Sequence, residues 1–174
     1  MKRIVFLMVS FILMTPYINA QEKKKFAVRT VAFYNVENLF DTINDPHKFD
    51  DDRTPEGADR WTSKVYNDHV HKIAKVISEI GSDVTKHAPD IVGLAEIENE
   101  AVVRDLINTE YLKKYNYGIV HYESPDARGV DVALIYKKSV FKPTASFPHP
   151  LSLTKDDGKP LYTRDQLLVS GELD

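Results

Sequence analysis

The stretch Asp90-Ile91-Val92-Gly93-Leu94-Ala95-Glu96-Ile97-Glu98-Asn99 decides the fold, because an apolar run leads directly into acidic residues. Residues 91–94 are typical of a buried strand, and Glu96 follows at the end of that strand. A strand of this kind buries its side chains, so a carboxylate at its end is expected to have a polar partner or a ligand. In α/β sheets, ligands bind outside the carboxyl ends of the strands. The stretch therefore predicts an α/β protein with a ligand site beside Glu96.

A second apolar run ends in the same way. Residues 28–34 are extended and apolar, and they lead into Asn35-Val36-Glu37-Asn38. Amide and carboxylate oxygens are the ligands that hard cations such as Mg²⁺ or Ca²⁺ prefer. We therefore predict that Asn35 and Glu96, at the ends of two strands, offer oxygen ligands to a metal ion.

The N-terminal residues have the pattern of a secretory signal peptide. Lys2 and Arg3 are basic, residues 4–13 are apolar, and Ala20 offers a small residue for cleavage. The alternative is an uncleaved membrane anchor, although the apolar run is shorter than the ~20 residues that a spanning helix needs. We expect an exported protein, periplasmic or extracellular, that starts near Gln21 and has no stable membrane insertion after cleavage.

Length and composition favour one folded unit after the leader. We expect a signal peptide at 1–20, a polar linker at 21–26 and a single folded part at 27–174. Without the leader, 21 basic residues face 26 acidic ones, which gives a net charge of −5. This is not the basic surface of a protein that coats nucleic acid, so a phosphate substrate would need a metal ion or a few Lys and Arg residues. Cysteine is absent, which excludes stabilisation by disulfides.

The periodicity predicts a layered sheet with helices outside, not a regular βαβ array. A helix is expected from Thr62 or Ser63 to about Ile80, with Gly81 just beyond its end. A shorter helix is expected at 101–112. The expected strands are 27–35, 91–96, 117–121, 130–136 and 161–173, with a turn at 155–160 and an irregular, proline-containing segment at 141–150.

The acidic segment 41–59 is expected to be a solvated loop. A calcium site is the alternative, but the spacing lacks the Gly and Glu positions of an EF-hand loop. Joint metal binding by His69 and His71 is not expected, because residues two apart do not share one face of a helix.

Four segments in order resemble the endonuclease/exonuclease/phosphatase family, which includes deoxyribonuclease I, abasic-site exonucleases, sphingomyelinases and inositol-phosphate phosphatases. These segments are Phe33–Phe40, Trp61–Ile80, Pro89–Glu96 and Arg128–Tyr136. The resemblance covers about residues 28–170. Asp131 and the Glu98-Asn99 pair make the chain similar to the secreted bacterial nuclease-like branch.

The resemblance implies a four-layered α/β sandwich (deoxyribonuclease I-like) that hydrolyses a phosphoester by in-line attack of water. It implies a divalent metal at the strand ends, usually Mg²⁺, with Mn²⁺ or Ca²⁺ as alternatives. Asn35 and Glu96 match the metal-site residues of the family. Arg164 lies where secreted nucleases often place an arginine against substrate phosphate, and a plain surface arginine is the alternative reading.

The sequence also departs from the family pattern. The Asn-His, Gly-Asp-Phe-Asn and Ser-Asp-His segments that carry the catalytic histidines and aspartate do not occur in it, and His121 and His149 lack the matching neighbours. No catalytic residue is therefore assigned. We expect residues 27–174 to be the N-terminal part of such a domain, inactive when expressed alone.

These observations lead to one functional prediction and two alternatives. The complete protein is predicted to be an exported, divalent-metal-dependent, endonuclease-like phosphodiesterase, with a phosphoester substrate for which nucleic acid is one candidate. A phosphatase or a phospholipid or sphingomyelin phosphodiesterase is the alternative among enzymes. The other alternative is a truncated or decayed half-domain that at most binds a metal or a partner, although no protein partner is evident from the sequence.

Overall fold

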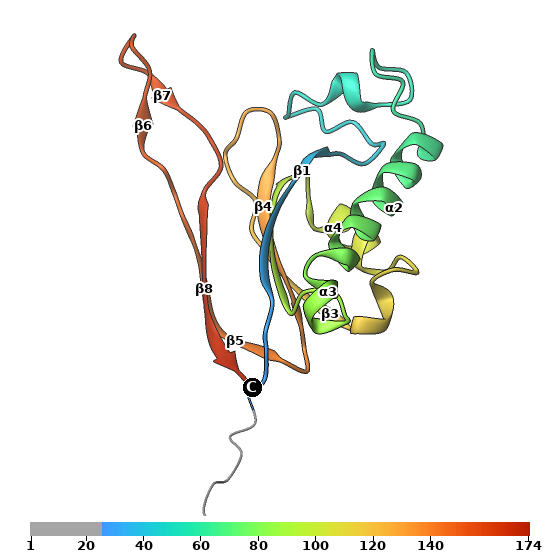
Figure 1. Ribbon diagram of the computed structural model, residues 1–174. Helices are drawn as coiled ribbons and strands as arrows, with labels where there is room; N and C mark the ends of the chain where they lie inside the picture. The colour runs from blue at the N-terminus through green and yellow to red at the C-terminus, as the bar shows by residue number, and fades with distance from the viewer. Residues whose placement is uncertain (1–25) are drawn as a thin grey trace, which may run out of the picture.

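The computed structural model describes residues 26–174, so the expected signal peptide and nearly all of the expected linker lie outside the described residues. The described residues form an α/β fold around a four-stranded sheet (Figure 1). Across this sheet lie β1 (Val31–Leu39), β2 (Ile91–Ile97), β4 (Asp131–Lys137) and β3 (Tyr117–His121). β1 and β2 are parallel, whereas β4 is antiparallel to β2 and β3. The C-terminal ends of β1, β2 and β3 therefore meet the start of β4 at one end, the carboxyl end of the sheet.

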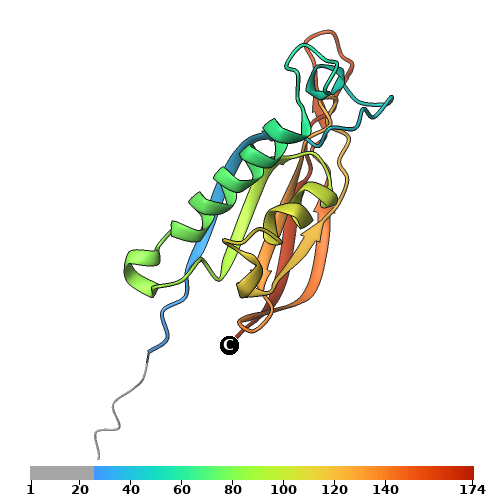
Figure 2. The same ribbon diagram turned by 90° about the vertical axis from the view of Figure 1, so that its right-hand side faces the viewer.

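Helices cover one face of this sheet. Figure 2 shows α2 (Ser63–Glu79) and α4 (Glu100–Ile107) side by side on that face. The chain also forms α3 (Ser82–Thr85) and the 3-10 turns η2 (Asp51–Arg53) and η3 (Lys113–Tyr115). The core between helices and strands is apolar, and its fully buried side chains include Ile77, Leu94, Leu106 and Ile135. None of the helices within residues 26–174 has the length and apolar character needed to cross a membrane.

The first helix confirms the sequence prediction. α2 begins directly after Thr62, whose hydroxyl accepts a hydrogen bond from the Val65 N–H at 3.4 Å. Such a cap satisfies one of the free N–H groups of the first turn. The helix ends before Gly81, whose φ of +67° lies in the left-handed region that glycine adopts without steric cost.

Three other elements have different bounds from those predicted, and the strand expected at 161–173 is β8 (Gln166–Leu173), which starts only at Gln166. The strand expected at 27–35 is β1, which starts later because its parallel register with β2 begins at Val31 opposite Ile91. The helix expected at 101–112 is α4, which ends at Ile107. Pairing between strands decides the start of β1, and a single sequence does not specify that pairing.

A two-stranded hairpin faces the other side of the sheet. It consists of β5 (Phe141–His149) and β8 (Gln166–Leu173), with β6 (Leu153–Thr154) and β7 (Pro160–Leu161) near its tip. An apolar cavity of about 780 Å³ lies between hairpin and sheet, and its lining includes Phe33, Leu134, Phe141 and Leu168. Helices, sheet and hairpin are three successive layers, which confirms the predicted α/β class.

The prediction that residues 141–150 are irregular is wrong. The structure forms β5 there, and the strand runs through both Pro143 and Pro148. β5 pairs only with β8, so the N–H groups on its other edge form no hydrogen bonds to a neighbouring strand. Proline, which has no N–H group, is tolerated at such edges. The register shifts between Pro143 and Ala145, which accommodates the first proline.

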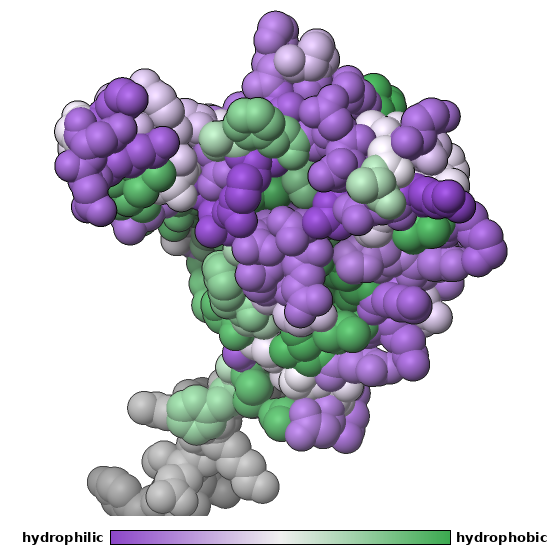
Figure 3. Space-filling view, turned by 90° about the horizontal axis from the view of Figure 1, so that it is seen from above, coloured by the Kyte–Doolittle hydropathy of each residue, from purple (hydrophilic) through white to green (hydrophobic). Residues whose placement is uncertain are grey.

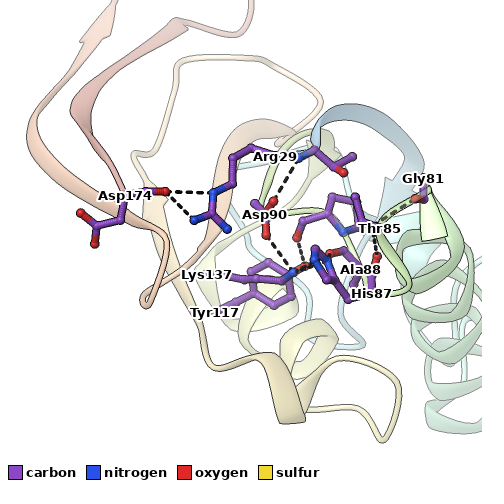
Figure 4. Close-up of polar contacts among 11 residues, drawn as sticks. Arg29, Gly81, Thr85, His87, Ala88, Asp90, Tyr117, Lys137 and Asp174 are labelled. Carbon is purple, nitrogen blue, oxygen red and sulfur yellow. Dashed lines mark hydrogen bonds and ion pairs between the residues drawn. The ribbon is translucent and has the colours of Figure 1, made fainter. Parts of the chain in front are cut away.

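A buried polar network closes the opposite end of the sheet (Figure 4). The Lys137 ammonium lies 2.9 Å from Asp90 Oδ1, and it also donates to the Ala88 carbonyl. The other Asp90 oxygen accepts the Thr30 N–H at 3.0 Å. Burial opposes the charge on Asp90, but the Thr30 N–H and the Lys137 ammonium outweigh it and lower the pKa of this carboxyl. The network ties β4 to the starts of β1 and β2, far from the carboxyl end.

Candidate metal and phosphate site at the strand ends

The two predicted metal ligands lie on neighbouring strands at the carboxyl end of the sheet. Asn35 in β1 is the register partner of Ala95 in β2, so Glu96 follows one residue further along. The Glu96 side chain is 17% exposed, whereas Asn35 is an exposed residue whose Oδ1 accepts the Glu37 N–H at 2.9 Å. β1 continues to Leu39, but its register with β2 shifts between Asn35 and Leu39, so the structure places both oxygen donors where the regular pairing of the two strands ends.

The backbone around these residues is irregular. Glu37, Asn38 and Glu96 have φ values of 55°, 64° and 67°, in the left-handed region that non-glycine residues rarely adopt. The pairing of β2 with β4 shifts register between Ala95 and Ile97, on either side of Glu96. Such conformations cost about 1–3 kcal/mol each and concentrate at binding and catalytic sites. The strain marks both strand ends as a candidate functional site.

Arg164 joins this site from a distant part of the chain. It lies between β7 and β8, and its Nη1 is 3.3 Å from Glu96 Oε1. Its Nε lies 3.8 Å from Oδ2 of Asp126, which is only 7% exposed. The guanidinium is thus held between two carboxylates instead of extending into solvent. This position is compatible with phosphate binding, which stays a prediction for Arg164.

The donor set at these strand ends suits a hard cation. Glu96 offers a carboxylate and Asn35 an amide oxygen, and Mg²⁺ is typically bound through one or two carboxylates, with water and substrate phosphate completing the coordination. The Arg164 guanidinium neutralises Glu96 in this structure, and it has the planar donor pattern that binds phosphate oxygens in pairs. Glu96 and Asn35 therefore offer oxygen ligands to a cation, and Arg164, in contact with Glu96, offers donors to an anion.

The acidic segment 41–59 is more ordered than the sequence predicts. It contains η2, and Asp50 is only 2% exposed, so the expectation of a solvated loop is wrong for this residue. Glu98, just beyond β2, is 4% exposed, and its Oε2 accepts the Asp41 N–H at 2.6 Å. Burial, together with the nearby charges of Asp41 and Asp50, raises the pKa of Glu98 to about 7.

A cavity of about 430 Å³ opens beside this segment. Its lining is rich in carboxylates and contains one ammonium group, from Asp41, Asp45, Lys48, Glu98 and Glu123. Seen from above in Figure 3, this end of the molecule is covered mainly by hydrophilic residues. The surroundings of the candidate site are therefore polar and predominantly acidic.

The raised pKa of Glu98 predicts a pH-dependent stability. The folded state keeps this proton up to about pH 7, whereas the unfolded chain releases it near 4.5, so stability falls as the pH rises between these values. Glu98→Gln mimics the protonated carboxyl and should remove this loss. The free energy of unfolding of Glu98→Gln minus that of the wild type should therefore increase by on the order of 1–3 kcal/mol between about pH 5 and about pH 8.

Urea unfolding at both pH values measures this effect. Glu79→Gln, at an exposed position in α2, is the matched control and should show no comparable change. A difference between Glu98→Gln and wild type that is the same at both pH values would show that Glu98 ionises normally.

Sequence reasoning missed a second group of polar residues at the same end. His121 Nε2 lies 3.1 Å from Asp131 Oδ2, and the two side chains are 5% and 1% exposed. The register opposes His121 to Ala133, two residues after Asp131, so both side chains lie on one face of the sheet. The two strands lie close together in the sequence, which favours their pairing, but the contact between His121 and Asp131 depends on the register of β3 against β4.

Comparison with known proteins agrees with this architecture. The sequence profile of the endonuclease/exonuclease/phosphatase family matches residues 30–174, and the chain belongs to this family. No curated protein matches the chain significantly. The assignment to this family therefore rests on the sequence profile, which covers nearly all of the described residues.

Two solved structures from Bacteroides thetaiotaomicron are similar to the chain. A mannosyl-6-phosphatase shares 20% identity over 72% of this chain, with a TM-score of 0.42. An endonuclease/exonuclease/phosphatase family protein shares 21% identity over 74% of this chain, also with a TM-score of 0.42. The matches cover 37% and 36% of those chains, so this chain spans just over a third of the length of either.

Proposed function

We propose that the complete protein is an exported, divalent-metal-dependent phosphodiesterase of the endonuclease-like kind. The observation that carries the proposal is the position of Asn35 and Glu96 on neighbouring strands, with Arg164 in contact with Glu96. Membership of the endonuclease/exonuclease/phosphatase family supports it. Export rests on the signal-peptide pattern of residues 1–20, which lie outside the described part of the chain.

In this proposal, Asn35 and Glu96 hold Mg²⁺, with Mn²⁺ or Ca²⁺ as alternatives. The metal supplies charge neutralisation for the phosphate and for the leaving oxygen. Arg164 turns its guanidinium from Glu96 to a phosphate oxygen when substrate is bound. The half-buried Glu96 carboxylate would then have the metal ion as its positive partner in place of Arg164.

A phosphomonoesterase is the second candidate, and the acidic surroundings favour it. Glu98, Asp41 and Glu123 line the neighbouring cavity, where they repel the extended backbone charge of a long nucleic acid. A small phosphoester, such as a sugar phosphate or a lipid head group, places only one phosphate near these acids. Cleavage of a phosphomonoester instead of a phosphodiester therefore distinguishes this candidate from the first.

An assay of the complete protein tests the proposal. Purified enzyme with Mg²⁺ should hydrolyse a chromogenic phosphodiester, lose this activity with a chelator, and regain it with added Mg²⁺ or Mn²⁺. Parallel reactions with duplex DNA and with a sugar phosphate decide between the candidates. Turnover that persists in excess chelator would refute a metal-dependent mechanism.

A further inference from the structure

His121, Glu123 and Asp131 form a compact group that the proposed hydrolysis does not use. One potential ligand atom from each residue lies within 4.8 Å of those of the other two. The His121 and Asp131 side chains are almost fully buried, whereas that of Glu123 is 60% exposed. An imidazole and two carboxylates, open to solvent on one side, resemble the three-ligand metal sites that leave a coordination position free.

The distance between the two buried groups fits ligands of one ion. His121 Nε2 and Asp131 Oδ2 are 3.1 Å apart. Two atoms bound to the same ion at about 2.0–2.1 Å, with angles of roughly 90–110°, lie about 2.9–3.4 Å apart. A hydrogen bond between them has the same length, so an ion replaces the shared proton with little movement of either side chain.

Ser124 holds the carboxylate in the required orientation. Its N–H donates to Asp131 Oδ1 at 2.9 Å, and its hydroxyl donates to the same oxygen. Asp131 Oδ2 is thereby left to face His121. Hydrogen bonds that orient a ligating carboxylate in this way are typical of metal sites, where they fix the geometry of the ligands.

A cation already occupies the open side of the group. The Lys48 ammonium lies 2.7 Å from Glu123 Oε2, and both residues line the cavity of about 430 Å³. The cavity therefore reaches Glu123, the exposed member of the group. A dication entering the group would compete with the ammonium for Glu123, which predicts that Lys48 weakens metal binding.

We propose that His121, Glu123 and Asp131 bind a divalent transition-metal ion of the zinc type. The imidazole favours such an ion over Mg²⁺ or Ca²⁺, which prefer oxygen ligands alone. The site is separate from the predicted Mg²⁺ site. Ala133, on the same face as Asp131, belongs to the core beneath the helices, whereas Glu96 contacts Arg164, which lies in the hairpin between β7 and β8.

Titration of the full chain with Zn²⁺ in excess Mg²⁺ tests this proposal, with Co²⁺ absorption spectra as a second readout. One equivalent of Zn²⁺ should bind, and Co²⁺ should give the visible bands of nitrogen and oxygen coordination. Glu123→Gln, at an exposed side chain, should weaken binding about tenfold, and His121→Ala by about a hundredfold. Lys48→Met should instead tighten binding severalfold, because it removes the competing ammonium.

His149→Ala is the matched control, because His149 is an exposed histidine at the end of β5. It should leave Zn²⁺ affinity unchanged. Circular dichroism checks that each variant folds, and Glu123→Gln and Lys48→Met keep the test decisive if His121→Ala does not fold. Absence of stoichiometric Zn²⁺ binding, or equal losses in Glu123→Gln and His149→Ala, would overturn the proposal.

Discussion

Glu96→Gln should lower the turnover of the complete protein by ~10²-fold or more while leaving the fold intact. The substitution keeps the size of the side chain but removes the charge that we assign to metal binding, and losses of this size follow removal of one group from an electrostatic site. Raising the Mg²⁺ concentration should recover part of the activity, because the Asn35 amide oxygen remains. Initial rates measured across a Mg²⁺ series, together with a thermal melt, check both expectations.

Glu172→Gln is the matched control for this substitution. Glu172 is an exposed glutamate in β8, opposite Lys142 in the hairpin and away from the carboxyl end of the sheet. Its replacement should not change turnover or the Mg²⁺ dependence. Wild-type turnover in Glu96→Gln would remove this residue from the mechanism, and an equal loss in both variants would point to a general effect of charge.

The largest effect on stability is expected for Lys137→Met. This substitution leaves the Asp90 carboxylate buried without its cation, and breaking a buried pair in this way costs about 3–5 kcal/mol. A loss of this size is a large fraction of the ~5–15 kcal/mol that stabilises a typical domain. Equilibrium unfolding in urea measures it. Lys138→Met, one residue further along but exposed, should change the free energy of unfolding by less than about 0.5 kcal/mol.

A double variant separates the two parts of this cost. Asp90→Asn combined with Lys137→Met removes both charges and keeps an oxygen acceptor for the Thr30 N–H. The double variant should therefore be more stable than Lys137→Met alone. If it is less stable, the Asp90 carboxylate stabilises the fold even without the ammonium, through the hydrogen bond that it accepts from the Thr30 N–H.

Local signals predicted the elements whose ends are set within the chain itself. The strand Tyr117–His121 has the predicted bounds, and α2 begins at its capping residue Thr62. The strand through Pro143 was missed, because its existence depends on β8, which lies more than twenty residues further along. Proline disfavours a strand only where its missing N–H is needed, and that is a property of the sheet.

The candidate site divides in the same way. Asn35 and Glu96 were predicted from the polar residues that end two apolar runs, and the structure places them on adjoining strands. The contact of Arg164 with Glu96 joins residues 68 positions apart, so only the family resemblance pointed to Arg164. The His121–Asp131 pair depends on the register of β3 against β4, and no residue pattern in one sequence specifies that register.

The origin of Arg164 has a mechanical consequence. Glu96 belongs to the sheet, whereas Arg164 belongs to the hairpin, between β7 and β8. An apolar cavity of about 780 Å³ lies between these two layers. Their separation therefore sets how far the guanidinium reaches. A ligand that binds both side chains bridges the two layers, so by linkage a substitution that changes the spacing of the layers is expected to alter ligand affinity without contacting the ligand.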